Sequence, residues 1–185
     1  GASTRMGRPK LLLPWGNTSI IGHLILQWRR LCARQIGIVC ATNDPLMSVE
    51  LDRIAFLTEH RIINVEPQRG MFGSICSAAR WPGWEPNLTH WVIVLGDQPH
   101  LRSETLSALL RFAATRVTSV CQPGRQGRRR HPVVLPRAIF RHLSDSTVAD
   151  LKSFLQAWPQ NLATCEMNDP GLDLDIDRAE DYEKA

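Results

Sequence analysis

The stretch Trp91-Val-Ile-Val-Leu-Gly-Asp-Gln-Pro99 decides the fold class of this chain. Its first five residues are all apolar, which is typical of a strand covered on both faces in the middle of a parallel sheet. Gly96 and Asp97 end the apolar run abruptly. We therefore expect a buried central strand whose carboxyl end presents Asp97.

Strand-like and helix-like segments alternate on both sides of this stretch. Helical spacing of apolar residues predicts helices over residues 19–34, from Asp44 onward, 70–80, 103–116 and 147–158. Short apolar runs predict strands at residues 36–41, 61–65, 117–121, 133–135 and 162–167. This alternation predicts an α/β fold in one domain over residues 1–185, with a mostly parallel sheet and helices on both faces.

The composition is that of an ordinary globular protein. The chain has 185 residues, of which 43% are hydrophobic and 22% charged, values that exclude disordered and collagen-like chains. The net charge of +4 suits a site for anionic phosphates and argues only weakly for nucleic acid, so we expect no nucleic-acid partner. No apolar run approaches the ~20 residues that span a bilayer, so we expect no membrane partner. The five cysteines form no C-x-x-C motif, which predicts buried free thiols and a cytoplasmic location.

Ligands of such sheets bind at the carboxyl ends of the strands, where we expect three segments to meet. The first is the loop Gly1-Ala-Ser-Thr-Arg-Met-Gly-Arg-Pro-Lys10. Its small residues would let backbone N–H groups approach a phosphate, and Arg5 and Lys10 would add charged hydrogen bonds. The alternative is a disordered basic terminus. The loop is not the common GK[ST] phosphate loop, because Leu11 follows Lys10.

The other two segments carry carboxylates. Asp97 ends a buried strand, where a charge is costly unless water, a cation or a metal such as Mg²⁺ reaches it. Asp173, Asp175 and Asp177 alternate with apolar residues, which in a strand puts three like charges on one face, where a cation would relieve their repulsion. The alternatives are a turn or cap role for Asp97, and an exposed acidic tail in which Asp177 caps a last helix.

Two further segments have features of binding loops. Residues 68–75 form a glycine turn into a helix, whose backbone donors could face a nucleobase or sugar; an ordinary helix start is the alternative. The basic loop Gly127-Arg-Arg-Arg-His-Pro132 could hold an anionic substrate, and a solvated loop is the alternative.

The order of these motifs is more specific than any one of them. The opening loop with its continuation Leu-Leu-Leu-Pro-Trp-Gly16, then Gly70-Met-x-x-Ser-Ile75, Leu95-Gly-Asp-Gln-Pro99, Arg-x-His-Pro132 and Asp-Ile-Asp-x-Ala-Glu-Asp-Tyr182 together resemble the MobA-like nucleotidyltransferases, and within them the molybdenum cofactor cytidylyltransferases. The resemblance implies a Rossmann-like nucleotidyltransferase fold. It also implies transfer of a nucleotidyl group, CMP from CTP, to the terminal phosphate of a molybdopterin-type cofactor, with release of pyrophosphate and a molybdoenzyme as recipient.

The resemblance also assigns roles to individual residues. The triphosphate would be held by Arg5 and Lys10 with the backbone of Gly1, Ala2, Ser3 and Thr4. Asp97 and Asp177 would bind Mg²⁺, with Asp175 as the alternative second ligand. Gly70 and Ser74 would lie along the base and ribose, and Arg129 and His131 would face the acceptor.

Two departures from the family pattern lead to further expectations. The family loop follows an apolar first strand, whereas this sequence opens at Gly1, so we expect native residues upstream of Gly1 to supply that strand. Arg130 stands where the family loop has glycine, which leaves the acceptor open. A transferase using another nucleotide or another phosphate acceptor, and a non-catalytic chaperone of the cofactor, are the alternative functions.

Overall fold

The computed structural model describes residues 9–185 and confirms the α/β class. Its α-helices are α1 (Ile20–Arg30), α2 (Pro45–Arg53), α3 (Gly70–Arg80), α4 (Ser103–Ala114), α5 (Arg137–His142), α6 (Leu151–Gln156) and α7 (Ala179–Lys184). Its strands are β1 (Pro14–Trp15), β2 (Thr18–Ser19), β3 (Ile38–Ala41), β4 (Arg61–Asn64), β5 (His90–Ile93), β6 (Val120–Arg125), β7 (Arg128–Arg129), β8 (Val133–Pro136) and β9 (Leu162–Glu166). Short 3₁₀ turns include η1 (Lys10–Leu12), η3 (Pro67–Arg69) and η5 (Pro170–Asp173).

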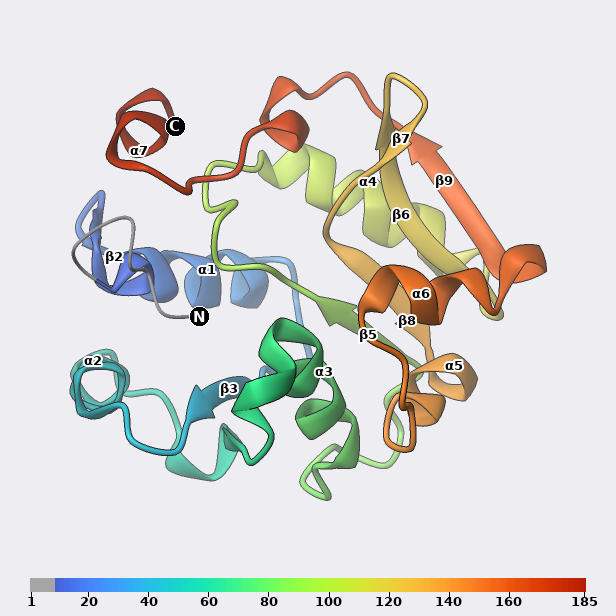
Figure 1. Cartoon of the computed structure of the whole chain (residues 1–185). Helices are drawn as coiled ribbons and strands as arrows, with labels where there is room; N and C mark the ends of the chain where they lie inside the picture. The colour runs from blue at the N-terminus through green and yellow to red at the C-terminus, as the bar shows by residue number, and fades with distance from the viewer. Residues whose placement is uncertain (1–8) are drawn as a thin grey trace.

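The strands form one five-stranded sheet and two smaller pairs (Figure 1). In the larger sheet β8 lies between β5 and β6, and β9 pairs with β6. Strands β3 and β4 make a separate parallel pair, and β1 and β2 form a hairpin that leads into α1.

Among residues 9–185 the larger sheet is mixed, whereas a mostly parallel sheet was expected. Pairs β3–β4 and β6–β9 are parallel, but β8 runs antiparallel to both β5 and β6. The reason is the short connection between β6 and β8, which turns back at Gln126 and Gly127, both at positive φ. A parallel partner needs a crossover of a dozen or more residues, so a chain that returns this soon can only pair antiparallel.

Strand β5 lies at an edge of its sheet within the described residues, and not in the middle as expected. It pairs only with β8, from His90 against Pro136 to Ile93 against Val133. All of its side chains are half-buried, and the strand ends at Ile93, before the apolar run does.

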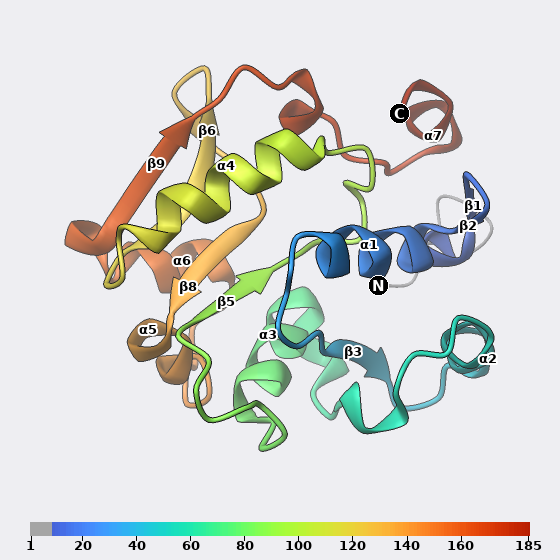
Figure 2. The same ribbon diagram turned by 180° about the vertical axis from the view of Figure 1, so that it is seen from behind.

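Helices cover both faces of the larger sheet, as predicted. Val120, Val133 and Leu135 pack on one face against α3, α5 and α6. Their neighbours Cys121 and Val134 point to the other face, against α4. Figure 2 shows α4 crossing β6 and β9 on this second face, with α5 and α6 behind the sheet.

The β3–β4 pair has its own smaller core. Ile21 and Ile25 of α1 meet Met47 and Leu51 of α2 over this pair. Helix α2 begins where expected, because the Asp44 side chain accepts a hydrogen bond from the Met47 N–H at 3.0 Å.

Two expectations drawn from composition can be compared with the structure. All five cysteines are free, but only Cys76 and Cys121 are buried. In residues 9–185 no helix has the length and apolar character that crossing a membrane requires.

Candidate active site

Three charged side chains from distant parts of the sequence meet beside the carboxyl end of β5. Lys10 belongs to η1, Asp97 to the turn after β5, and Asp177 to the segment between η5 and α7. The Lys10 Nζ atom lies 3.1 Å from Asp177 Oδ1 and 3.7 Å from Asp97 Oδ2. The ammonium group thus stands between the two carboxylates that the sequence singled out as metal ligands.

Glycine at position 96 lets the Lys10 segment approach Asp97. A Cβ atom on Gly96 would lie 2.3 Å from Cδ2 of Leu11, well inside contact distance. Leu11 therefore packs directly onto the backbone beside Asp97. Because Leu11 follows Lys10 in the sequence, this contact places the ammonium group next to the Asp97 carboxylate.

The C-terminal segment reaches the site through a buried anchor. Ile176 is fully buried, and its N–H donates to the Asp97 carbonyl oxygen at 2.9 Å. The predicted alternation holds in burial, since Leu172 and Ile176 are buried, whereas Asp173 and Asp175 between them and Asp177 after them are exposed. The predicted strand does not form, because the segment begins as the turn η5 and then runs without a ladder partner among the described residues.

The three aspartates consequently have different partners. Asp177 faces Lys10, Asp173 pairs with Arg125 and Arg130, and Asp175 accepts a hydrogen bond from Gln98 Nε2 at 2.8 Å. One shared cation does not serve all three carboxylates. Of the two aspartates expected as second ligand and its fallback, Asp177 lies at Lys10 and Asp175 lies at Gln98.

Asp97 is held in an environment that disfavours its charge. Burial raises the pKa of Asp97, the Lys10 ammonium lowers it in part, and the charges of Asp175 and Asp177 add to the rise. Its Oδ1 atom is buried and has no hydrogen-bond partner among residues 9–185. A buried carboxylate oxygen without a donor is costly, and a cation bound there would remove that cost.

These residues fit a divalent cation that a substrate helps to hold. Within residues 9–185 no group of three or more His, Cys, Asp or Glu side chains gathers closely enough to enclose a metal ion. Mg²⁺ does not need such a cage, because it takes one or two carboxylates and completes its shell with water and substrate phosphates. Asp97, with its unpaired oxygen, and Asp177 are the two carboxylates that could hold such an ion.

The basic loop has separated roles. Arg130 Nε donates to Asp173 Oδ1 at 2.9 Å, which ties the loop to the C-terminal segment. Arg129 points to the opposite edge, where its Nε donates to Thr164 Oγ1 of β9 at 3.3 Å. His131 is half-buried; burial lowers its pKa and the nearby charge of Asp175 partly raises it. Of the two residues expected at the acceptor, His131 lies closer to the aspartates of the site.

The expected base and ribose residues lie at the start of α3. Gly70 is exposed and has φ of +59°, a conformation that glycine adopts without strain. The Ser74 hydroxyl accepts a hydrogen bond from Asn64 Nδ2 at 3.1 Å. Helix α3 follows β4, so its first turn lies at the carboxyl end of the β3–β4 pair. The residues expected around the triphosphate, Gly1, Ala2, Ser3, Thr4 and Arg5, lie outside the described residues.

An aromatic contact joins the two ends of the described chain beside the site. The ring of Trp15, in the hairpin, meets the ring of Tyr182 of α7 edge-on, with the centroids 6.0 Å apart. The Tyr182 hydroxyl donates to the Pro14 carbonyl oxygen. Both views show α7 beside this hairpin (Figures 1 and 2). The contact holds α7, and with it Asp177, against the segment that carries Lys10.

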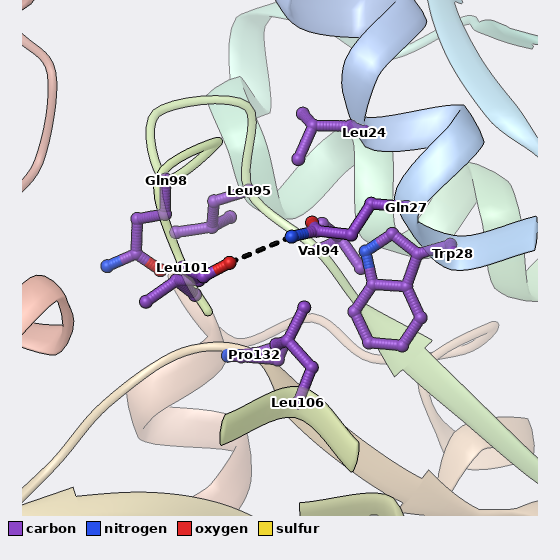
Figure 3. A pocket seen from close by; sticks show the side chains of 9 residues that line it. All are labelled: Leu24, Gln27, Trp28, Val94, Leu95, Gln98, Leu101, Leu106 and Pro132. Carbon is purple, nitrogen blue, oxygen red and sulfur yellow. Dashed lines mark hydrogen bonds between the residues drawn. The ribbon is translucent and has the colours of Figure 1, made fainter. Parts of the chain in front are cut away.

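The cavity next to the site is too small for a nucleotide. It has a volume of about 10 Å³, room for roughly one water molecule, and lies between α1, the turn after β5 and Pro132. Figure 3 shows Gln27 spanning it to the Leu101 carbonyl oxygen, a hydrogen bond of 2.8 Å. The Gln98 amide group points away from Gln27, toward the side where it meets Asp175 (Figure 3).

Sequence reasoning missed two residues that build this site. Gln98 follows Asp97 directly and is 6% exposed, yet a lone glutamine in a turn gives no signal of a long-range partner. Leu11 belongs to an apolar run that is interpreted as packing on any protein. A signal for Leu11 existed in Gly96, since a glycine after a buried strand often marks the close approach of another segment.

Comparison with known proteins agrees with the fold. The structure of Rv0371c from Mycobacterium tuberculosis H37Rv superposes with a TM-score of 0.76 at 22% identity, covering 100% of this chain and 92% of that one. A second structure of Rv0371c, in complex with manganese, gives a TM-score of 0.65 at 23% identity, covering 97% and 92%. Molybdopterin-guanine dinucleotide biosynthesis protein A from Archaeoglobus fulgidus gives 0.67 at 13% identity, covering 100% and 92%.

A CTP-bound structure has the same fold. The synthetase of CMP:2-keto-3-deoxy-manno-octonic acid, complexed with CTP, gives a TM-score of 0.71 at 13% identity, covering 97% of this chain and 91% of that one. No curated protein sequence matches this chain. The profile of the MobA-like NTP transferase domain matches residues 1–162, which include Lys10, Asp97 and His131 but end before Asp177. The chain therefore belongs to the MobA-like NTP transferase family and has the Rossmann-like nucleotidyltransferase fold.

Proposed function

We propose that this protein is a Mg²⁺-dependent cytidylyltransferase that transfers CMP from CTP to the terminal phosphate of a molybdopterin-type cofactor. The observation that carries the proposal is the position of Lys10 between Asp97 and Asp177, at 3.7 and 3.1 Å. An ammonium group suits the phosphates of a nucleoside triphosphate, and two carboxylates beside it suit the metal ion that such a triphosphate carries. A site that only binds a nucleotide does not need this pair of carboxylates.

Each of the three side chains has a distinct role in this proposal. Asp97 and Asp177 would hold Mg²⁺, which when bound neutralises phosphate charge and polarises the phosphorus–oxygen bonds. Lys10 would donate to the triphosphate, as would Arg5 and the backbone of Gly1, Ala2, Ser3 and Thr4. Its ammonium group then exchanges its carboxylate partners for phosphate oxygens.

The transfer needs no nucleophile from the protein. An oxygen of the acceptor phosphate, already anionic, forms a bond to the α-phosphorus of CTP. The bond from the α-phosphorus to the bridging oxygen breaks, and pyrophosphate leaves with that electron pair. The protein's contribution is to align two anions that repel each other and to stabilise charge on the leaving group. We therefore assign no general base.

The remaining residues would bind the two substrates. Gly70 and Ser74, in the first turns of α3, would lie along the base and ribose. His131 would face the acceptor, and Arg130 would set the position of this loop through its ion pair with Asp173. Arg129, which bonds to Thr164 of β9, is left out of the acceptor site. His131 supports this role best, because burial favours its neutral form, which can accept as well as donate a hydrogen bond.

The choice of CTP and of a molybdopterin acceptor rests on the family and on the sequence motifs. Family membership supports an NTP as the donor. Similar structures include one complexed with CTP and one of a molybdopterin-guanine dinucleotide biosynthesis protein. The motifs around Lys10, Asp97 and Asp177 resemble those of the molybdenum cofactor cytidylyltransferases.

The test is pyrophosphate release from CTP, GTP, ATP and UTP, each with molybdenum cofactor and Mg²⁺. We expect release with CTP alone, only when cofactor is present, and loss of release with Asp97→Asn. Release with GTP alone would show that the reaction is nucleotidyl transfer but that the donor is GTP and not CTP. Binding of cofactor and CTP without pyrophosphate release from any nucleotide would indicate a chaperone and refute the enzyme.

A further inference from the structure

We propose that Gln98 is a positioning residue: it holds Asp175 away from the Lys10 centre, so that Asp177 alone joins Asp97 there. This inference rests on the proposed function and deepens it. It assigns the second carboxylate of the site, and it gives a role to the residue that follows Asp97.

Two adjacent hydrogen bonds join the turn after β5 to the C-terminal segment. Gln98 Nε2 donates to Asp175 Oδ1 at 2.8 Å, and the Ile176 N–H donates to the Asp97 carbonyl oxygen at 2.9 Å. The two bonds involve consecutive residues in each segment, 97 and 98 in the turn and 175 and 176 in the C-terminal segment. This double connection fixes the register of the segment, so Asp177 comes next and lies at Lys10.

The side chain of Gln98 is itself held firmly. Gln98 is 6% exposed, and its main-chain carbonyl oxygen accepts a hydrogen bond from the Leu101 N–H. With Leu95 and Pro132 it lines the small cavity (Figure 3). An amide group fixed in this way can orient a flexible, exposed carboxylate such as that of Asp175.

Charge explains why a neutral donor suits this position. Asp97, Asp175 and Asp177 lie near one another, and Asp175 and Asp177 both disfavour the charge on Asp97. A lysine or arginine at position 98 would add a positive charge that repels a metal ion. A glutamate would repel Asp175. Glutamine donates one hydrogen bond to Asp175 and changes no charge.

The test exchanges donor and acceptor. Gln98→Glu places two carboxylates face to face. Asp175→Asn keeps the bond, because the Gln98 amide can donate to the asparagine oxygen. In the double variant Gln98→Glu/Asp175→Asn the asparagine amide donates to the glutamate, which restores the bond in reverse with the wild-type number of charges. Thermal unfolding of each variant shows whether it folds.

The first readout is binding of Mn²⁺ in the presence of CTP, measured by electron paramagnetic resonance. We expect Gln98→Glu to weaken binding roughly 10- to 100-fold, as loss of a group that orients a metal ligand does. Asp175→Asn and the double variant should bind close to wild type. If Asp175→Asn alone abolishes binding and the double variant fails to recover it, Asp175 is itself the ligand and the inference is wrong.

The second readout needs neither metal nor nucleotide. Hydrogen–deuterium exchange of the peptide over residues 172–178 should be faster in Gln98→Glu and return to wild type in the double variant. Unchanged exchange in Gln98→Glu would overturn the positioning role. Failure of the wild-type protein to bind Mn²⁺ with CTP would instead refute the proposed function, and the exchange data would still decide the role of Gln98.

Discussion

The two candidate metal ligands are built into the molecule in different ways. Asp97 lies in the turn that follows strand β5, and its side chain is 25% exposed. Asp177 lies in a segment without regular structure beyond the matched residues 1–162, and its side chain is 56% exposed. The sheet positions the first carboxylate, whereas side-chain and loop contacts position the second, among them those with Lys10, Gln98 and Asp181.

This difference separates stability from function at the two carboxylates. The charge of Asp97 is unfavourable where the fold puts it, as expected for a group kept for binding a cation. Asp177 costs the fold little, because it stays in contact with water. We therefore expect changes at Asp97 to affect activity and stability in opposite directions, and changes around Asp177 to affect mainly ligand affinity.

The largest effect is expected for Asp97→Asn. Turnover should fall roughly 10²- to 10³-fold, the loss typical of removing one preorganised electrostatic group. The metal-free variant should unfold at a higher temperature than wild type at neutral pH. The pKa of Asp97 is raised in the folded protein, so its ionised carboxylate lowers the stability in full at pH values above the folded-state pKa. Below the unfolded value of ~3.9 the carboxyl group is protonated in both states and this cost disappears.

The gain in melting temperature should therefore shrink as the pH falls toward 4. Differential scanning fluorimetry across this pH range, with pyrophosphate release as the activity assay, checks both parts. Wild-type turnover in the variant would remove Asp97 from the site.

Lys10→Met should come second. Loss of a charged hydrogen bond to the triphosphate, worth about 1.5–3 kcal/mol, should weaken binding of Mn²⁺ with CTP about 10- to 100-fold. Mn²⁺ without nucleotide should bind more tightly than to wild type, because Asp97 and Asp177 lose the ammonium group between them. Lys152→Met, on an exposed position of α6, is the matched control and should change neither affinity. Weaker binding of Mn²⁺ alone would contradict the position of Lys10.

Gly96→Ala should disturb the packing beside Asp97, the less exposed of the two carboxylates. Its Cβ would press on Leu11 at 2.3 Å, and overpacking of this kind costs about 1–3 kcal/mol of folding free energy. Chemical denaturation should show this loss, together with a higher KM for CTP as Lys10 is displaced. Shortening the neighbour in Gly96→Ala/Leu11→Ala should recover part of the KM. No change in KM in the single variant would show that Leu11 does not position Lys10.

Tyr182→Ala should have the smallest effect, confined to α7 and the exposed carboxylate of Asp177. The ring contact with Trp15 is worth about 0.5–1.5 kcal/mol, so binding of Mn²⁺ with CTP should weaken about 2- to 10-fold while the melting temperature stays nearly constant. Tyr182→Phe keeps the ring and loses only the hydrogen bond to Pro14, so its loss should be smaller. Equal losses in the two variants would place the effect in the hydroxyl group.

Local patterns predicted the elements better than their assembly. The predicted helix over residues 70–80 is α3 without a change of bounds, because its apolar spacing and glycine start are local signals. The strand expected at residues 117–121 instead runs over Val120–Arg125 as β6, since Pro123 and Gly124 broke its apolar pattern. The apolar run at residues 133–135 revealed a strand but not its direction, which the preceding turn decides.

The sequence predicted that the N-terminal loop, the turn at Asp97 and the C-terminal aspartates meet, and the structure brings Lys10, Asp97 and Asp177 together. The prediction was possible because ligands bind at the carboxyl ends of strands in such folds. The sequence could not separate Asp175 from Asp177, because that choice depends on Gln98, 77 residues away along the chain. Partners over such distances are set by packing, which no local pattern contains.

The most direct test of the central claim is anomalous diffraction from crystals soaked with Mn²⁺ and CTP. We predict a manganese peak ligated by carboxylate oxygens of Asp97 and Asp177 and by the triphosphate, with Lys10 Nζ turned to a phosphate oxygen and Asp175 still bonded to Gln98. A manganese peak ligated by Asp175 in place of Asp177, or a triphosphate bound away from Lys10, would contradict the account.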